Sequence, residues 1–513
     1  MAYTEQFKEC IRFWGNDLAT VPFAEFCLEI AFKKLISAAK VVIFMRCQVN
    51  WLPLQNRFLD RMKKIFALLN LFIVLSVQAQ NADVRISALM GKSRWFDLAQ
   101  ELHVTPADSV NPLLHKMALA MTYHYFNQSD SACIVLGDLL NNHQEELGGN
   151  TLNMAVLLGM NLARTDHYAE AAGLIQNLCD QLKASGTDST QIEILLTLVQ
   201  QYHALANNAP ICQPLHQADT YRIPMKTHNT MHTVDDKTNE GHFITMDGRI
   251  NGLESSLVFD TGAGVNTMSS SQARDYGLHL LDTTIPLAGI GIQHGQYAIA
   301  DTLQIGGMAW ANVPFLVADF QTGNTKADSI GALLPPVIGL PIMLRMKEVQ
   351  LDFEHRMFII PATPSLRPFN ESNLLRTDSE GLRFATTDED GHPLYFHFDT
   401  GGYNTTLLPH WYEQHKDEVQ TVGIPDSLRV AGVGAVQMTR SYLLPHKEFR
   451  LGNATTVLDS VIVNTGVDLH SAELKKEQFL EGEEDGTLGL NLLERFKLVI
   501  FNLKGMYLEA IPY

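Results

Sequence analysis

The sequence predicts a multidomain protein of the α plus β class, in which an all-helical N-terminal domain precedes a bilobed, mainly β part with pseudo-two-fold symmetry. Three observations lead to this prediction. The 513-residue chain is longer than one hydrophobic core usually spans. Helical periodicity dominates residues 82–206 and nearly disappears from about residue 225. The same order of strands, turns and short motifs then occurs twice.

The composition excludes several classes of protein. The formal net charge is −18 and no basic face is visible along the chain, so nucleic acid is not expected as a partner. The cysteines match no zinc or redox spacing, and none follows Cys212. His228 and His232 are four residues apart, as metal ligands on a helix can be, but their polar segment lacks a third ligand and reads as a solvated linker. We therefore expect no metal and no cofactor.

Residues 62–79 have the features of a secretory signal peptide, although they lie inside the chain. A basic start precedes an apolar run over residues 65–77, which ends in small residues typical of a cleavage site. The alternative is a transmembrane anchor, but the run is shorter than the ~20 residues that span a bilayer. We expect cleavage near Gln80, a periplasmic or secreted mature protein, and no stable membrane anchor. Residues 1–61 would precede the true start at Met62 and be absent from the mature protein.

The helical domain is assigned to residues 80–210. Its clearest unit runs from Asn153 to Leu182, with a helix–helix turn near Arg164-Thr165-Asp166 and small or apolar residues at Ala155, Leu158-Gly159, Tyr168, Ala171-Ala172 and Leu174. This unit resembles a tetratricopeptide hairpin, and a generic helical bundle is an equal alternative. Either fold favours packing or the binding of a protein partner over chemistry. Asn and Pro residues between 207 and 224 predict a linker.

Each half of the β part contains an apolar strand that ends in Asp-Thr-Gly. In the first half, a turn at Asn251-Gly252 leads into a strand that ends in Asp260-Thr261-Gly262. In the second half, a turn over residues 388–391 leads into a strand that ends in Asp399-Thr400-Gly401. Later elements recur in the same order: Gly289-Ile290-Gly291 with Gly432-Val433-Gly434, Leu303 to Gly306 with Phe449 to Gly452, Ile338-Gly339-Leu340 with Leu488-Gly489-Leu490, and Phe353 with Phe501. We assign residues 225–365 and 366–513 to two lobes.

The two aspartates permit acid–base chemistry if the lobes bring them together. Like charges a few ångströms apart do not both ionise easily, so two such carboxyl groups share one proton. Asp260 and Asp399 would then supply one acid and one base in a single site. Gly262 and Gly401 would let the backbone approach this pair, and Thr261 and Thr400 could hydrogen-bond across the junction.

Over residues 235–513 the sequence resembles the retropepsin-like aspartic peptidases, in particular the bacterial type with two motifs in one chain. Asp260-Thr261-Gly262-Ala263 resembles their active-site motif, and Ile338 to Met343 and Leu488 to Leu493 resemble the elements that support the catalytic loop. The resemblance implies Asp260 and Asp399 as catalytic residues, supported by Thr261, Gly262, Ala263, Thr400, Gly401 and Gly402. It also implies an extended peptide between the lobes and candidate flaps at Gly289-Ile290-Gly291 and Gly432-Val433-Gly434. Gly402 departs from the family, which usually has Ala, Ser or Thr there.

The leading hypothesis is therefore an exported aspartic-type endopeptidase that hydrolyses protein or peptide substrates. The alternative is a non-catalytic exported module that binds peptides on the same scaffold, which the unusual Gly402 motivates. A third arrangement would pair each half with its copy in a second chain to form a dimer with two sites. The covalent link between the halves favours pairing within one chain.

Overall fold

The computed structural model describes residues 82–513, with gaps at residues 188, 209, 217–218, 235–236, 289–291, 320–327, 329–330, 332, 369–370, 379, 433–434 and 469–483. The expected signal peptide at residues 62–79 and the segment 1–61 lie outside the described residues. Of the two candidate flap tips, only Gly432 is described. Within this part of the chain, no helix is long and apolar enough to cross a membrane.

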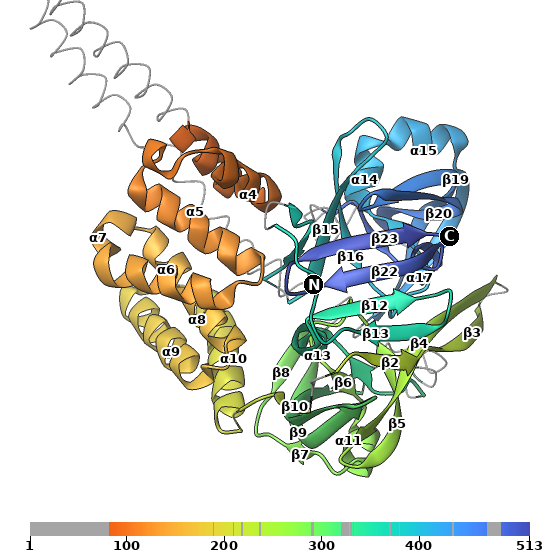
Figure 1. Cartoon of the computed structure of the whole chain (residues 1–513), viewed down its shortest axis with the longest axis horizontal. Coiled ribbons are helices and arrows are strands. Elements are labelled where there is room, and N and C mark those ends of the chain that lie inside the picture. The colour runs from red at the N-terminus through yellow and green to blue at the C-terminus, as the bar shows by residue number, and fades with distance from the viewer. Residues whose placement is uncertain are drawn as a thin grey trace, which may run out of the picture.

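The described chain begins with a helical domain, which lies on one side of the β part (Figure 1). Residues 82–91 are helical, and the further helices are α4 (Trp95–Val104), η2 (Ala107–Ser109), α5 (Pro112–Tyr125), α6 (Ser129–Asn142), α7 (Gln144–Leu147), α8 (Asn150–Arg164), α9 (Tyr168–Ser185) and α10 (Ser189–Ala206). Contacts run between successive long helices, from α4 with α5 to α9 with α10. The predicted helical region is thus confirmed.

Three tight turns connect antiparallel helices in this domain. Ser93, Asn127 and Asp166 occupy them with φ of 53°, 54° and 66°. In each turn the next residue donates its N–H to a carbonyl in the last turn of the preceding helix, at 2.8 to 2.9 Å, which satisfies an otherwise unpaired group. The last of these turns joins α8 to α9, where the sequence predicted a hairpin. There a Cβ added to Gly159 would lie 2.6 Å from Cδ1 of Ile175, so the glycine permits close helix packing.

We call residues 226–346 lobe 1. Its elements are β3 (Lys226–Val234), β4 (Lys237–Ile250), β5 (Leu253–Phe259), β6 (Thr267–Met268), α11 (Ser270–Asp275), β7 (His279–Leu280), β8 (Ile285–Ala288), β9 (Ile292–Ile305), β10 (Met308–Val317), β11 (Val337–Ile338) and α13 (Leu340–Met346). The strand order is β1-β10-β6-β11-β5-β4-β9-β7, where β1 is Gln213–His216. Because β9 also pairs with β10, the sheet closes on itself around a buried core.

We call residues 374–494 lobe 2. Its elements are β14 (Leu374–Arg376), β15 (Leu382–Thr387), β16 (Pro393–Phe398), β17 (Thr406–Leu407), α14 (Pro409–Gln414), α15 (Lys416–Val422), β18 (Ile424–Gly432), β19 (Ala435–Leu451), β20 (Ala454–Asp468), β21 (Gly486–Leu488) and α17 (Leu490–Leu493). The strand order is β14-β15-β16-β21-β17-β20-β19-β18. The two lobes with several sheets confirm the mainly β character of this part.

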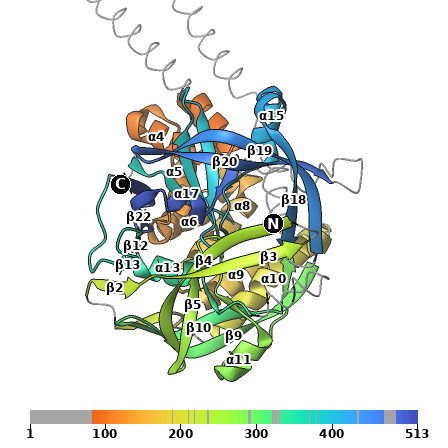
Figure 2. The same cartoon turned by 90° about the vertical axis from the view of Figure 1, so that its right-hand side faces the viewer.

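A third sheet joins the lobes. It consists of β2 (Tyr221–Pro224), β13 (Met357–Ile360), β12 (Glu348–Asp352), β22 (Phe496–Asn502) and β23 (Tyr507–Pro512), in that order. At its centre β12 pairs antiparallel with β22, and the buried Val349 lies opposite the buried Phe501. In Figure 2 this sheet lies at the left of the molecule, and the β3–β4 hairpin extends from it toward the right. The helices of the helical domain lie behind both lobes. The shared backbone hydrogen bonds make the lobes one folded unit.

Two segments predicted as linker form strands. Within residues 207–224, β1 pairs with β10 of lobe 1 and β2 joins the central sheet. The segment with His228 and His232 forms β3, which pairs along β4. His228 Nε2 lies 2.8 Å from Thr245 Oγ1, and its ring stacks on Phe243. Backbone pairing with neighbouring strands forms these strands, so the linker prediction was wrong there.

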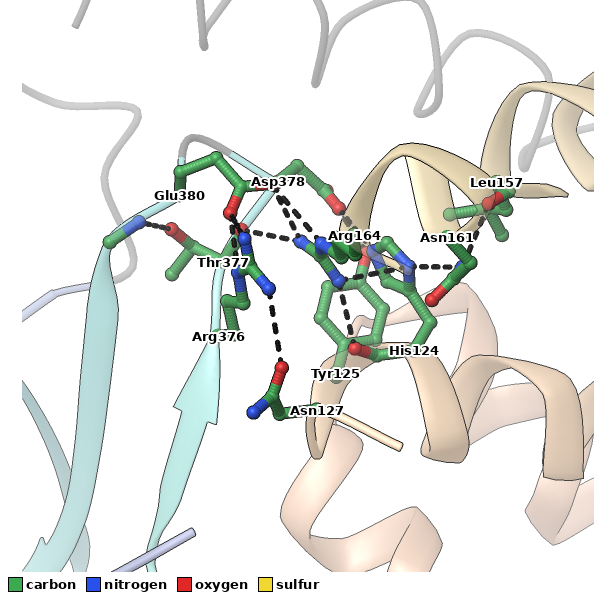
Figure 3. A network of polar contacts seen from close by, with 11 residues as sticks. His124, Tyr125, Asn127, Leu157, Asn161, Arg164, Arg376, Thr377, Asp378 and Glu380 are labelled. Atoms are coloured by element: carbon green, nitrogen blue, oxygen red, sulfur yellow. Dashed lines mark hydrogen bonds and ion pairs between the residues drawn. The ribbon is translucent and has the colours of Figure 1, made fainter. Parts of the chain in front are cut away.

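Polar contacts fix the helical domain to lobe 2 (Figure 3). Arg164, whose side chain is 3% exposed, donates from Nε to Glu380 Oε1 (3.1 Å) and from Nη1 to the carbonyl of His124 (3.0 Å). The ring of His124 and the hydroxyl of Tyr125 each lie 3.0 Å from an oxygen of Asp378. The domain also reaches lobe 1, since Gln201 donates to the hydroxyl of Tyr297 (2.8 Å). The helices therefore contact both lobes.

Candidate active site

Each Asp-Thr-Gly motif lies at the carboxyl end of a strand in the middle of its sheet. Asp260 follows β5, and its N–H donates to Ile338 in the parallel strand β11 (3.1 Å). Asp399 follows β16, and its N–H donates to Leu488 in the parallel strand β21 (3.1 Å). Parallel pairing directs both strand ends to one edge of the sheet. The two aspartates are therefore placed by matching local structures.

The two carboxyl groups lie side by side, since a Cβ added to Gly262 would lie 3.0 Å from Asp399 Oδ1 and 3.2 Å from Asp260 Oδ1. Asp260 Oδ1 accepts from the N–H of Gly262, and Asp399 Oδ1 accepts from the N–H of Gly402, both at 2.8 Å. A Cβ added to Gly401 would lie 2.5 Å from Asp260 Oδ2, so no larger residue fits this position unchanged. Both aspartates are partly exposed as whole residues. The structure thus brings together the two residues that the sequence singled out.

Thr261 and Thr400 tie the two loops together below the carboxyl groups. The N–H of Thr261 donates to Thr400 Oγ1 (3.0 Å), and the N–H of Thr400 donates to Thr261 Oγ1 (3.1 Å). The Thr400 hydroxyl in turn donates to the carbonyl of Phe259 (2.8 Å). Both threonines are buried, so these bonds are shielded from water. This arrangement limits movement of one aspartate relative to the other.

A second layer supports each loop. The N–H of Leu340 donates to the carbonyl of Ala263 (2.9 Å), and the N–H of Leu490 donates to the carbonyl of Gly402 (3.1 Å). Gly339 must be a glycine, because a Cβ there would lie 2.4 Å from the Ala263 carbonyl oxygen. The apolar-apolar-Gly elements therefore contact the loops directly.

The sequence analysis missed two buried residues of this layer. The N–H of Gly339 donates to Asn266 Oδ1 (3.0 Å), and the N–H of Gly489 donates to Thr405 Oγ1 (3.1 Å). Asn266 and Thr405 follow their aspartates at the same interval and are both 1% exposed. A hydrogen-bonding side chain recurring at equivalent positions of the repeat was the signal that could have identified them.

The surroundings favour the protonated form of Asp260. Burial and the neighbouring charge of Asp399 raise the pKa of Asp260 from 3.8 to about 7, although the N–H groups of Gly262 and Gly401 oppose the shift. The carboxyl pair therefore holds one proton over a broad pH range. Such a pair can donate a proton from one oxygen and accept one at another.

The raised pKa of Asp260 predicts a pH-dependent contribution to stability. Between pH values near 3.8 and about 7 the folded state holds the proton that the unfolded state has released. The stability contributed by this group therefore falls as pH rises, by up to about 1.4 kcal/mol per pH unit. We expect Asp260→Asn to gain stability relative to the wild type from pH 4 to pH 7, measured by urea unfolding. A constant difference across this range would contradict the shifted pKa.

Replacement of Thr400 tests the junction between the loops. Thr400→Val removes the hydroxyl that bonds Thr261 and Phe259, leaving a buried donor and acceptor unpaired. We expect a loss of about 3 kcal/mol in the free energy of unfolding. Thr400→Ser keeps the hydroxyl and is expected to lose about 1 kcal/mol. Urea midpoints measure both, and equal losses would mean that the hydroxyl is not the cause.

The candidate flap tips cannot be placed against the site, because Gly289-Ile290-Gly291 and Val433-Gly434 lie outside the described residues. The strands beside them are described. β8 and β9 pair antiparallel up to Ala288 and Ile292, and β18 and β19 pair up to Gly432 and Ala435. The flanking strands are thus consistent with hairpins, and the flap assignment stays a prediction.

Clusters with metal-ligating atoms lie elsewhere. In the described part of the chain they are Asp352, Glu354 and His355, and Asp388, Asp390 and His392. Both lie at turns outside the Asp260–Asp399 site and include exposed residues. The Asp388 carboxylate already accepts hydrogen bonds from the N–H groups of Asp390 and His392, at 2.9 and 2.7 Å. These contacts form a turn.

Part of the chain is similar to a known protein family. No curated protein matches the chain. Residues 246–341 match the family model described as aspartyl protease. This segment includes Asp260-Thr261-Gly262 and the Gly339 element that supports it, and ends within α13. The match supports an aspartyl protease scaffold for this part of the chain.

Proposed function

We propose that the protein is an exported aspartic endopeptidase in which Asp260 and Asp399 form the catalytic dyad. The observation that carries this proposal is the pair of carboxyl groups side by side between the two loops, which the reciprocal hydrogen bonds of Thr261 and Thr400 hold together. The pKa of Asp260, raised to about 7, agrees with it. The aspartyl protease match around Asp260 adds support. A peptide-binding module without catalysis would gain nothing from two carboxyl groups held side by side.

The proposed reaction is the addition of water to a peptide bond. The ionised carboxylate of the pair accepts a proton from a water molecule, whose oxygen attacks the carbonyl carbon of the substrate. The protonated carboxyl group donates to the carbonyl oxygen, which gains negative charge during the attack. Proton transfer to the leaving nitrogen then accompanies cleavage of the C–N bond. The pair thus supplies acid and base in one step.

The repeated hydrogen bonds support a pseudo-two-fold relation between the lobes. Asp260 and Asp399, their supporting glycines Gly339 and Gly489, and the threonines between the loops all make equivalent contacts. We extend the proposal to a TPR-like helical domain, which the three helical hairpins support. Binding of a protein partner through this domain remains part of the same proposal.

Export rests on the signal-peptide-like segment at residues 62–79. We propose a periplasmic or secreted mature protein that starts near Gln80. The formal net charge of −18 suits a soluble protein that repels polyanions.

The test of function is cleavage of a mixed peptide library by the purified protein between pH 3 and pH 8. Cleavage that a statine-type inhibitor blocks would support the proposal, since such inhibitors engage a carboxyl pair. The same assay with Asp399→Asn assigns the activity to the pair. Absence of cleavage at every pH in this range would reject the proposed function.

A further inference from the structure

The turn between α8 and α9 contacts both lobes. At the end of α8, the guanidinium of Arg164 donates to Glu380 Oε1 (3.1 Å) and to the carbonyl of Thr377 (3.3 Å) in lobe 2, as Figure 3 shows. Two residues later, both carboxylate oxygens of Asp166 accept from Nη2 of Arg345 in lobe 1, at 2.6 and 2.7 Å. Neighbouring positions of one tight turn therefore contact both lobes.

Arg345 belongs to the helix that supports the loop of Asp260. The first residue of α13, Leu340, bonds the carbonyl of Ala263, and Gly339 before it bonds Asn266. The apolar face of α13 is buried, with Leu340, Ile342, Met343 and Met346 at most 1% exposed. The helix and the loop therefore move together. Asp166 contacts this unit through Arg345, near the C-terminal end of α13. The N-terminal end of the same helix contacts the loop of Asp260.

The corresponding helix of lobe 2 is held by a different segment. Glu494 directly follows α17, and its Oε1 lies 2.6 Å from Nε2 of His242 in β4 of lobe 1. The neighbouring Gly241 approaches Tyr403, since a Cβ added there would lie 3.2 Å from the Cβ of Tyr403. Each supporting helix is thus contacted, at its carboxyl end, by a polar side chain from outside its own lobe.

We propose that Asp166 is a positioning residue for Asp260, acting through Arg345 and α13, so that the helical domain is a working part of the active site. This proposal rests on the proposed peptidase function. The α8–α9 turn is a brace between the lobes: Arg164 fixes it on lobe 2, and Asp166 fixes lobe 1 to it. Proton sharing between Asp260 and Asp399 requires a set distance between the lobes. A helical segment removed for activation would take this brace away.

Asp166→Asn is the test variant, because Asn tolerates the positive φ of the turn but lacks the charge. We expect kcat to fall about five- to tenfold with KM nearly unchanged, since the loss is one of alignment and not of substrate contact. The pH profile of kcat/KM should shift as well. Arg345→Gln should have the same effect, and the double variant should be no worse than either single variant.

The matched control is Asp138→Asn. Asp138 pairs with Lys116 inside the helical domain, and its side chain is about as exposed as that of Asp166, at 39% against 31%. We expect this variant to keep the wild-type kcat and pH profile. If both variants lose stability but only Asp166→Asn loses kcat, the effect on the active site is not a consequence of lower stability.

Hydrogen exchange supplies a readout that does not depend on activity. In Asp166→Asn, the amides of residues 260–266 and 338–346 should exchange several-fold faster than in the wild type and in Asp138→Asn. Unchanged exchange, kcat and pH profile in Asp166→Asn would overturn the brace. A wild-type protein that cleaves no peptide would instead reject the proposed function, while the exchange rates would still decide whether Asp166 positions the loop.

Discussion

Asn in place of Asp260 or Asp399 is expected to lower kcat by about 10³-fold or more, without unfolding the protein. The amide cannot accept the proton of the attacking water or share a proton with its neighbour. It can still accept the hydrogen bond that the carboxylate receives from Gly262 or Gly402, so the loop keeps its structure. Initial rates on a peptide that the wild type cleaves, together with circular dichroism spectra, measure both parts of this expectation.

Asp485→Asn is the control for loss of a buried carboxyl group. Asp485 is 3% exposed, and burial raises its pKa as it does that of Asp260. Its Oδ2 accepts from the N–H of Tyr395 (2.7 Å), a bond that an Asn oxygen can retain. We expect this variant to keep activity within about threefold of the wild type. Full activity of Asp399→Asn would show that the proposed dyad is not the catalytic centre.

The second large effect concerns stability. Arg164→Met is expected to lower the free energy of unfolding by about 3 kcal/mol. The substitution leaves Glu380, the carbonyl of His124 and the carbonyl of Thr377 without the donor that now serves all three. Arg376 also pairs with Glu380 and would keep that contact, so the loss falls mainly on the two carbonyl groups. Urea unfolding, followed by the fluorescence of the tryptophans, measures the loss.

Arg164→Lys sharpens this test. A lysine keeps the charge but not the planar fork of donors, so it is expected to recover less than half of the loss. Asp138→Asn, at an exposed ion pair of the same domain, is expected to change the stability far less than Arg164→Met does. Equal effects of Arg164→Met and Asp138→Asn would mean that the network in Figure 3 contributes nothing beyond a surface pair.

The surroundings of His124 explain why this interface depends on Arg164. Burial and the positive charge of Arg164 lower the pKa of His124, whereas its contact with Asp378 acts in the opposite direction. Burial tends to raise the pKa of Asp378, but hydrogen bonds from His124 and Tyr125 and the charge of Arg164 lower it overall. The network thus keeps an ionised carboxylate at a buried position. Such a group needs its donors in place.

Local patterns in the sequence were sufficient for several features. The predicted change from helices to strands is present in the structure, although the first strand already begins at Gln213, and the α8–α9 turn lies near Asp166 as predicted. The repeat placed Asp260 and Asp399 at equivalent strand ends, and the structure has them there. These features depend on short-range preferences, so they can be recognised without knowledge of long-range contacts.

Other features of the structure correspond to no local pattern in the sequence. The described side chains of β1 are all exposed, and those of β3 over residues 226–230 are at most partly buried, so neither strand shows apolar alternation. Their partners β10 and β4 supply the hydrogen bonds that form them. Asn266 and Thr405 likewise acquire a role only when the supporting glycines pack beside them.

The sequence by itself determined the classes of secondary structure, the two Asp-Thr-Gly turns and their repetition. Only the tertiary structure decided which charged residues are buried and what they join. The sequence alone would place Arg164, Asp166 and Glu380 on a solvated surface. In the structure the side chain of Arg164 is buried, those of Asp166 and Glu380 are partly buried, and the three residues connect the helical domain to both lobes. The physical reason is that burial of a charge depends on partners supplied by distant segments, and no property of the residue or its neighbours in the chain encodes that pairing.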